Sequence, residues 1–182
     1  MVRRTMIKTM ILIFIICISS FADEKSIRED FWVGLDAGIG QVKLTLNDMD
    51  KKDVKFFLGF EIGYAINPHL LTGIELSGWL YEPTDINNPL KGEGLSQVLI
   101  MTRFYPSIEH AIFAKIGGGY ISHWNNINRT RRKNGLGISV GAGYDIHFRG
   151  NWFITPFLSY SLGEEGNQKH KALSLVAGIT WY

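Results

Sequence analysis

The chain is dominated by an alternation of apolar residues with small or polar ones, at a period of two. In Val54–Ile66 every even position is apolar, whereas the odd positions hold mostly glycine, charged residues and Phe57. Successive side chains of a β-strand point to opposite faces, so this pattern predicts a strand with one continuous apolar face. The last residues of the chain, ALSLVAGITWY, show the same pattern.

Eight segments carry this alternation, and each is as long as a strand that crosses a membrane, about 9–11 residues. Strands of soluble sandwiches are shorter, usually about 5–6 residues. The fold class predicted is therefore all-β, an up-and-down eight-stranded antiparallel transmembrane β-barrel. The seventh segment is the weakest because it contains Pro156. The segments are Phe31–Gln41, Val54–Ile66, Leu70–Leu80, Ser96–Tyr105, Ala111–His123, Leu136–Phe148, Trp152–Leu162 and Ala172–Tyr182.

The connections between these segments alternate in length, as in outer-membrane barrels with short periplasmic turns and longer extracellular loops. Both termini are then expected on the periplasmic side. The short turns are Asn67–His69, Pro106–Glu109 and Arg149–Asn151, and the longer loops are Asn47–Asp53, Tyr81–Gly94, Asn125–Asn134 and Gly163–Lys171.

Residues 1–22 have the pattern of a secretory signal peptide: a basic start, the apolar run Met10–Ile18 and small residues before Asp23. Cleavage after Ala22 would leave one barrel domain, residues 23–182.

The whole chain has 19 Lys+Arg and 17 Asp+Glu. Removing three basic residues with the leader leaves 16 against 17, so the charge gives no reason to expect nucleic acid as a partner. Cys17 lies in the leader, and no disulfide is expected.

The glycine- and aromatic-rich stretches GISVGAGYDIHF and FAKIGGGYISHW, the turn at Tyr64–Pro68 and the aromatic C-terminus resemble the small outer-membrane β-barrel family. This family contains OmpA/OmpX-like eight-stranded barrels and porin-family or opacity-type surface proteins. The resemblance implies a location in the cell outer membrane, contact with its lipid and lipopolysaccharide, and a monomer. It also implies that strand 172–182 is recognised by the barrel assembly machinery.

Charged residues on the glycine-rich face are expected to point into the lumen. An eight-stranded interior is just wide enough for side chains to fill, and an uncompensated buried charge costs several kcal/mol. These charges therefore form either an ion gate or proton path, or a salt-bridged plug, and the plug is favoured. The residues are Asp36, Glu61, Glu75, Arg103, Lys115 and Asp145.

The segment Asn125–Asn134 concentrates four cations, Arg129, Arg131, Arg132 and Lys133. On the cell surface they could bind sulfated glycans, other host-surface polyanions or lipid phosphates through charge-assisted contacts. The alternative is a solvated loop whose cations only neighbour anionic head groups.

Catalytic chemistry finds little support in the sequence. The five histidines are scattered, so no metal site is expected, and no cofactor motif is present. A PagL-type lipid A deacylase would need a histidine and an asparagine around Ser161, and both are missing. We expect that the protein is not an enzyme but a structural barrel that interacts with other surfaces in the manner of an adhesin. The alternative is a narrow OmpW-like pore for small or apolar solutes.

Overall fold

The computed structural model describes residues 28, 30–46, 49–80, 93–107, 111–125, 130–165 and 168–182. The predicted signal peptide, residues 1–22, lies outside this part of the chain, as does most of the predicted loop Tyr81–Gly94. Among the described residues, no helix has the length and apolar character needed to cross a membrane.

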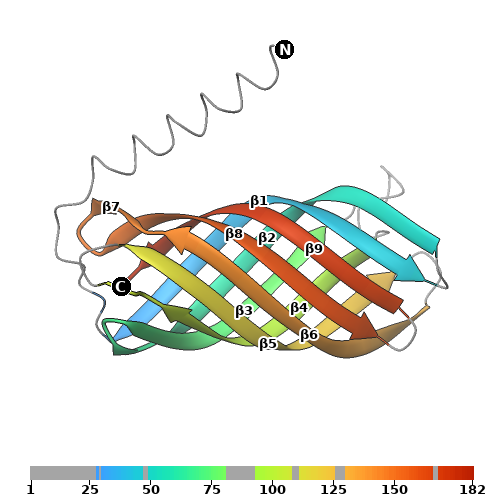
Figure 1. The fold of residues 1–182 in the computed structure, drawn as a ribbon, viewed down its shortest axis with the longest axis horizontal. Helices are drawn as coiled ribbons and strands as arrows, with labels where there is room; N and C mark the ends of the chain where they lie inside the picture. The colour runs from blue at the N-terminus through green and yellow to red at the C-terminus, as the bar shows by residue number, and fades with distance from the viewer. Residues whose placement is uncertain are drawn as a thin grey trace, which may run out of the picture.

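The described residues form one closed antiparallel β-sheet (Figure 1). Consecutive strands pair with each other, except that the sixth and seventh both pair with the eighth, and the first strand pairs with the last, which closes the barrel. The fold class predicted from the alternation is thereby confirmed. The strands are β1 Phe31–Leu46, β2 Met49–Asn67, β3 Leu70–Leu80, β4 Glu93–Phe104, β5 Ile112–Asn125, β6 Thr130–Tyr144, β7 Ile146–Arg149, β8 Trp152–Glu165 and β9 Gln168–Trp181.

The predicted sixth strand is interrupted, and β6 and β7 are its two parts. β6 pairs with β8 as far as Gly143 opposite Phe157, and β7 resumes with Ile146 opposite Ile154. The register is the same on both sides of the gap, so Pro156 lies opposite Tyr144, where the β6–β8 pairing stops. Proline has no N–H to donate to a ladder, which explains the break. The prediction of one continuous strand over Leu136–Phe148 is therefore wrong at this point, although the barrel remains eight-stranded.

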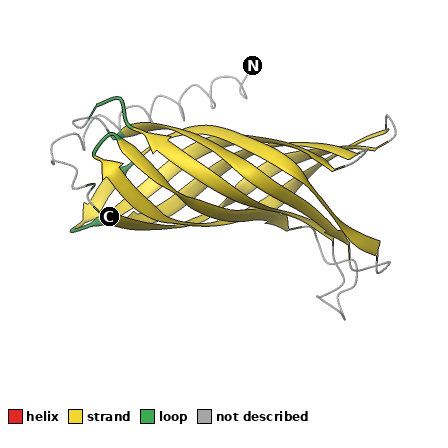
Figure 2. Cartoon of the chain, turned by 90° about the horizontal axis from the view of Figure 1, so that it is seen from below, coloured by secondary structure: helices red, strands yellow, loops and turns green. Residues whose placement is uncertain are grey.

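Three of the predicted long loops are largely strand. The β1–β2 pairing reaches Leu46 opposite Met49, so the predicted loop Asn47–Asp53 is wrong, and Asn125–Asn134 and Gly163–Lys171 are replaced in the same way. Outside the hydrocarbon both faces of a strand can be polar, so the alternation disappears while the backbone ladder continues. Figure 2 shows these strands continuing as long hairpins at the end away from the C-terminus.

The two faces of the wall differ as the alternation predicts. Large apolar side chains point outward and are exposed, with Ile100 at 72% and Leu136 at 70%. The inward face buries four large aromatic side chains, Trp32, Phe57, Trp79 and Phe113, which are at most 1% exposed. The barrel thus has an apolar outer wall and a filled interior.

A charge on the middle of the outer wall should destabilise the barrel. We expect Ile100→Lys, midway along β4, to lower the free energy of unfolding by about 2–4 kcal/mol in lipid vesicles. Leu136→Lys is the matched control, because it lies opposite Glu164 near the outer rim and should cost only about 0–1 kcal/mol. Urea titration of the vesicle-folded chains measures both, and equal effects would contradict the placement of the membrane.

Candidate functional site in the charged lumen

Four charged side chains meet in the lumen, one from each of the strands β2 to β5. The register places Glu61 directly opposite Glu75 and Arg103 directly opposite Lys115. Like charges directly opposite each other on one face destabilise a sheet. The pairing of adjacent strands therefore places like charges together. The opposite charges that compensate them have to come from strands that are not adjacent.

Ion pairs between non-adjacent strands supply that compensation. Lys115 Nζ lies 2.7 Å from Glu61 Oε1 and 3.0 Å from Glu75 Oε2. Arg103 Nη2 forms a third ion pair with Glu61 Oε2. All four side chains are nearly or fully buried. Two acids and two bases balance within this layer, which we call the ion-pair layer.

Polar and aromatic neighbours complete the ion-pair layer. Glu75 Oε1 accepts hydrogen bonds from Ser77 Oγ at 2.5 Å and Gln97 Nε2 at 3.2 Å. The guanidinium carbon of Arg103 lies 4.8 Å from the ring centroid of Trp32 and 4.9 Å from that of Phe113. Such cation–π contacts stabilise a desolvated cation by up to about 2 kcal/mol. The layer is therefore packed against rings as well as neutralised.

Asp145 is the centre of a second cluster, at the end of the barrel that holds the C-terminus and is expected to face the periplasm. Its Oδ2 accepts hydrogen bonds from the hydroxyls of Tyr105 and Tyr182, both at 2.8 Å. Its Oδ1 accepts one from Thr155 Oγ1 at 2.9 Å. Asp145 lies at the β6–β7 interruption, so the break in the ladder coincides with this cluster. Tyr182 also connects the two clusters, because Arg103 Nη1 donates to its hydroxyl at 3.5 Å.

Arg28, from the segment before β1, fills the same end of the lumen. Its side chain is buried, with Nε 3.5 Å from Asp145 Oδ2. The guanidinium carbon lies 3.7 Å above the ring centroid of Tyr105. A residue outside the strands therefore supplies the positive charge that Asp145 requires.

Asp36 differs from the other lumen acids. It is buried, and neither carboxylate oxygen has a hydrogen-bond partner within the described part of the chain. The residues opposite it on the two neighbouring strands are Gly59 and Gly178. A Cβ atom at Gly178 would lie 2.2 Å from Asp36 Oδ1. These glycines therefore leave the space that the carboxylate occupies.

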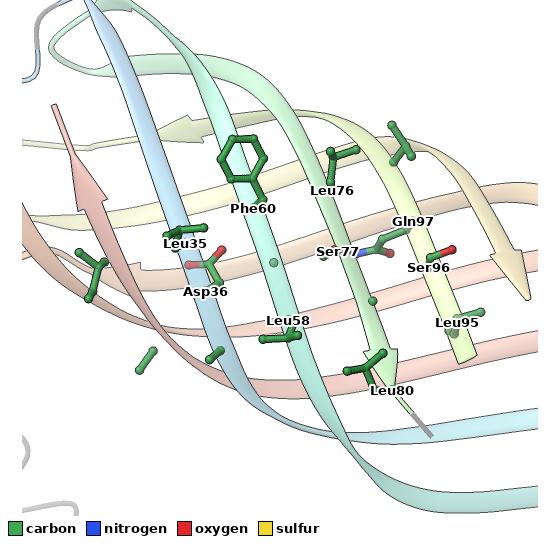
Figure 3. A pocket seen from close by; sticks show the side chains of 16 residues that line it. Leu35, Asp36, Leu58, Phe60, Leu76, Ser77, Leu80, Leu95, Ser96 and Gln97 are labelled. Carbon is green, nitrogen blue, oxygen red and sulfur yellow. Dashed lines mark hydrogen bonds between the residues drawn. The ribbon is translucent and has the colours of Figure 1, made fainter. Parts of the chain in front are cut away.

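The outer wall beside Asp36 has an apolar hollow of about 830 Å³ (Figure 3). Leu35, Leu58 and Leu76 of three adjacent strands line it. These leucines are exposed, whereas Asp36, the next residue in β1, is buried on the other face. The lining also includes Asp36, Ser77 and Gln97, which are buried residues of the lumen face.

The side chains of the four cations predicted to bind polyanions are outside what the structure describes. Arg129 lies outside the described residues. Arg131, Arg132 and Lys133 lie in β6 by their backbone, and their side chains are not among those described. The prediction of a loop is wrong for the backbone of these three residues, since they form part of the β5–β6 hairpin.

Catalytic geometry is not evident around the residues considered for it. The Ser161 hydroxyl donates to Ser139 Oγ at 3.1 Å, so its partner is another hydroxyl rather than a base. Among the described residues no group of three or more His, Cys, Asp or Glu side chains could hold a metal ion.

Sequence reasoning oriented the charged residues but did not find several of their partners. Tyr105 and Tyr182 continue the inward parity of β4 and β9 by one residue beyond each strand, a signal that could have placed them in the lumen. Ser77 and Gln97 carry the same parity signal. Arg28 lies before the first strand, where no periodicity reaches it.

Comparison with known proteins agrees with this architecture. A family model described as "Outer membrane protein beta-barrel domain" matches residues 9–178. The chain belongs to this family. As a family member it is an outer-membrane β-barrel, which places the apolar wall in the lipid of that membrane. A search of curated proteins finds no match.

Two solved structures illustrate the shared fold. Neisserial surface protein A superposes with a TM-score of 0.57 at 17% identity, over 83% of this chain and 96% of that one. Ail, the attachment invasion locus protein of Yersinia pestis, superposes with a TM-score of 0.52 at 12% identity, over 84% of this chain and 99% of that one. That Ail structure is a complex with the heparin analogue sucrose octasulfate. At these identities the likeness shows the fold alone.

Removal of Arg103 should leave Glu61 without one of its two buried partners. We expect Arg103→Ala to lower the free energy of unfolding by about 3–5 kcal/mol, because an uncompensated charge remains in the lumen. Lys169→Ala is the control, since Lys169 is exposed near the outer end of β9, opposite the exposed Glu164, where solvent screens the charges. Thermal unfolding in detergent compares the variants, and unchanged unfolding of Arg103→Ala would contradict a structural role.

The terminal residue can be tested for two separate roles. Tyr182→Phe keeps the aromatic C-terminus but removes a hydroxyl that donates to Asp145. We expect the level of membrane-inserted barrel to stay unchanged, while the free energy of unfolding falls by about 1.5–3 kcal/mol. Outer-membrane fractionation and urea unfolding measure the two quantities. A fall in insertion with unchanged stability would assign the hydroxyl to assembly instead.

Proposed function

We propose that this protein is a closed, non-enzymatic barrel that anchors an anion-binding surface in the outer membrane. The observation that carries the proposal is the ion-pair layer of Glu61, Glu75, Arg103 and Lys115, in which charges that could line a water path neutralise one another. The barrel then acts as a rigid support, and recognition occurs at its cell-surface end.

The contents of the lumen support closure. Eight strands leave an interior that side chains can fill, and here Trp32, Phe57, Trp79 and Phe113 are buried in it, with Trp32 and Phe113 against Arg103 of the ion-pair layer. Trp79 Nε1 donates a hydrogen bond to Ser174 Oγ at 2.9 Å, which links β3 to β9 through the lumen. A solute would have to displace both rings and ion pairs.

The surface end supplies the cations for recognition. Arg129, Arg131, Arg132 and Lys133 lie within five consecutive sequence positions, and the last three belong to the start of β6 by their backbone. Guanidinium groups bind sulfate and phosphate through paired hydrogen bonds. The complex of Ail with a heparin analogue is a precedent within the same fold. Sulfated host-surface glycans are therefore the partner class that we assign to this hairpin.

The binding test uses intact cells that display the native chain or a variant with Arg129, Arg131, Arg132 and Lys133 replaced by glutamine. We expect adhesion to immobilised heparin to fall at least about tenfold at equal surface level, and to weaken with salt. Arg149→Gln is the control, because this exposed cation lies at the turn before β8, at the periplasmic end. Equal adhesion of native and variant cells would contradict the glycan assignment.

The same purified chain should not conduct ions in planar bilayers. A steady conductance that disappears on unfolding would contradict closure and favour the alternative of a narrow pore. Conductance that appears only in Arg103→Ala would instead support the ion-pair layer as the closing element.

A further inference from the structure

His170 of β9 has a buried ring near the cell-surface end of the barrel. It is 2% exposed, and neither Nδ1 nor Nε2 has a hydrogen-bond partner within the described part of the chain. A neutral imidazole has one N–H donor and one acceptor nitrogen, whereas the protonated ring has two donors and a positive charge. Burial without partners therefore disfavours the protonated ring much more than the neutral one.

The ring occupies a space that a glycine leaves open. The residues directly opposite His170 are Leu44 of β1 and Gly163 of β8. A Cβ atom at Gly163 would lie 2.0 Å from Nε2 of His170, so the ring lies over this glycine. Neither of the two opposite residues has a polar side chain, so a proton added to the ring meets no side-chain acceptor directly opposite it.

The ring lies beyond the apolar wall and close to solvent. Its neighbours in β9, Lys169 and Lys171, are exposed on the outer face, and charged residues there mark the end of the apolar band. His170 also lines a hollow of about 290 Å³ together with these lysines and Glu164 of β8. The hollow gives water and protons from outside the cell a short path to the buried nitrogens.

A second histidine points into the same end of the lumen. His123 of β5 lies two residues after the buried Ile121, and alternate residues of a strand share a face. Burial, and after it the charge of the nearby His123, lower the pKa of His170 from 6.5 to about 4. In acid, protons on both rings would bring two like charges together inside the barrel.

The other described residues on the lumen face around His170 supply no free counter-charge. The nearest inward residues of β1 and β8 are uncharged, and the charged inward residues at this end of β2 form an ion pair with each other. The uncharged residues are Val42, Leu44, Ser161 and Gly163, and the ion pair joins Lys55 to Asp53.

We propose that His170 is an acid sensor at the cell-surface end of the barrel, and that its protonation loosens the pairing of β9 with β1 and β8 around it. The neutral ring stays buried over Gly163. The protonated ring carries a charge without a partner and is repelled by His123, so it leaves the lumen for water and disturbs the strands beside it. Because the β1–β9 pairing closes the barrel, acid opens the outer end of this closure. The proposal does not depend on the glycan assignment made above.

The direction of the pH effect follows from the protons that each form binds. An exposed histidine takes up its proton near pH 6.5, whereas the buried ring does so only near pH 4. Between these values the opened form binds more protons, so the stability of the closed form is complete above about pH 6.5 and is lost as the pH falls toward about 4. Opening should therefore become roughly 30-fold more favourable between about pH 8 and about pH 5.

The test measures hydrogen exchange of the folded chain in phosphatidylcholine nanodiscs by mass spectrometry, at two pH values and corrected for the intrinsic effect of pH on exchange. Between about pH 8 and about pH 5, protection of residues 168–172 should fall roughly 30-fold in the native chain and stay nearly constant in His170→Gln. His123→Gln removes the repelling charge and should show a smaller fall. His147→Gln is the matched control and should keep the native response, because His147 lies in β7 at the opposite end, with its Nε2 2.7 Å from the Gly150 carbonyl oxygen.

Three results would overturn the proposal: equal protection of the native chain at both pH values, an equal fall in His170→Gln, and loss of the response in His147→Gln. Should His170→Gln fail to fold, an NMR titration of the imidazole nitrogens in the native chain, in the same nanodiscs, provides the second test. Proton uptake by His170 near pH 4 is expected. Uptake near the value of an exposed ring, about pH 6.5, would contradict the buried sensor.

Discussion

Closure of the backbone ladder is the constraint on which this structure depends. In the hydrocarbon of a membrane, every N–H and C=O must find a partner within the protein, and a barrel achieves this only when its last strand pairs with its first. The β1–β9 pairing does so over Val33–Leu46. Once closed, the sheet has no edge at which the register can slip without cost. The positions of all lumen side chains then follow from one set of pairings.

That set of pairings places side chains of like charge directly opposite each other in the lumen. In the lumen, Glu61 and Glu75 form one like pair and Arg103 and Lys115 the other, and the two pairs satisfy each other across the barrel. Because the β2–β3 pair and the β4–β5 pair each place like charges together, the charges favour only an arrangement in which all four strands are in register. Electrostatics thus adds specificity for the closed state, beyond the modest net stability of buried ion pairs.

Alternation in the sequence was sufficient to predict the fold class and the direction of most side chains. It oriented Glu61 and Arg103 correctly, because parity depends only on position along a strand. It could not identify their partners, which depend on the register between strands. It also failed at the surface end, where the ladder continues although the outward residues, such as Lys43 and Lys52, are no longer apolar. Arg28 was missed because no strand periodicity extends to it, and the interruption at Asp145 is a consequence of Pro156 on the neighbouring strand.

The burial of Arg28 has a consequence for the order in which the barrel is completed. Arg28 precedes every strand in the chain, yet its contacts are Tyr105 beyond β4 and Asp145 between β6 and β7. These partners are brought together only after the later strands have paired. The earliest described residue is therefore among the last to reach its native environment, and contacts of such wide sequence separation form slowly. Arg28 can therefore fill this end of the lumen only after the strands that carry its partners have paired.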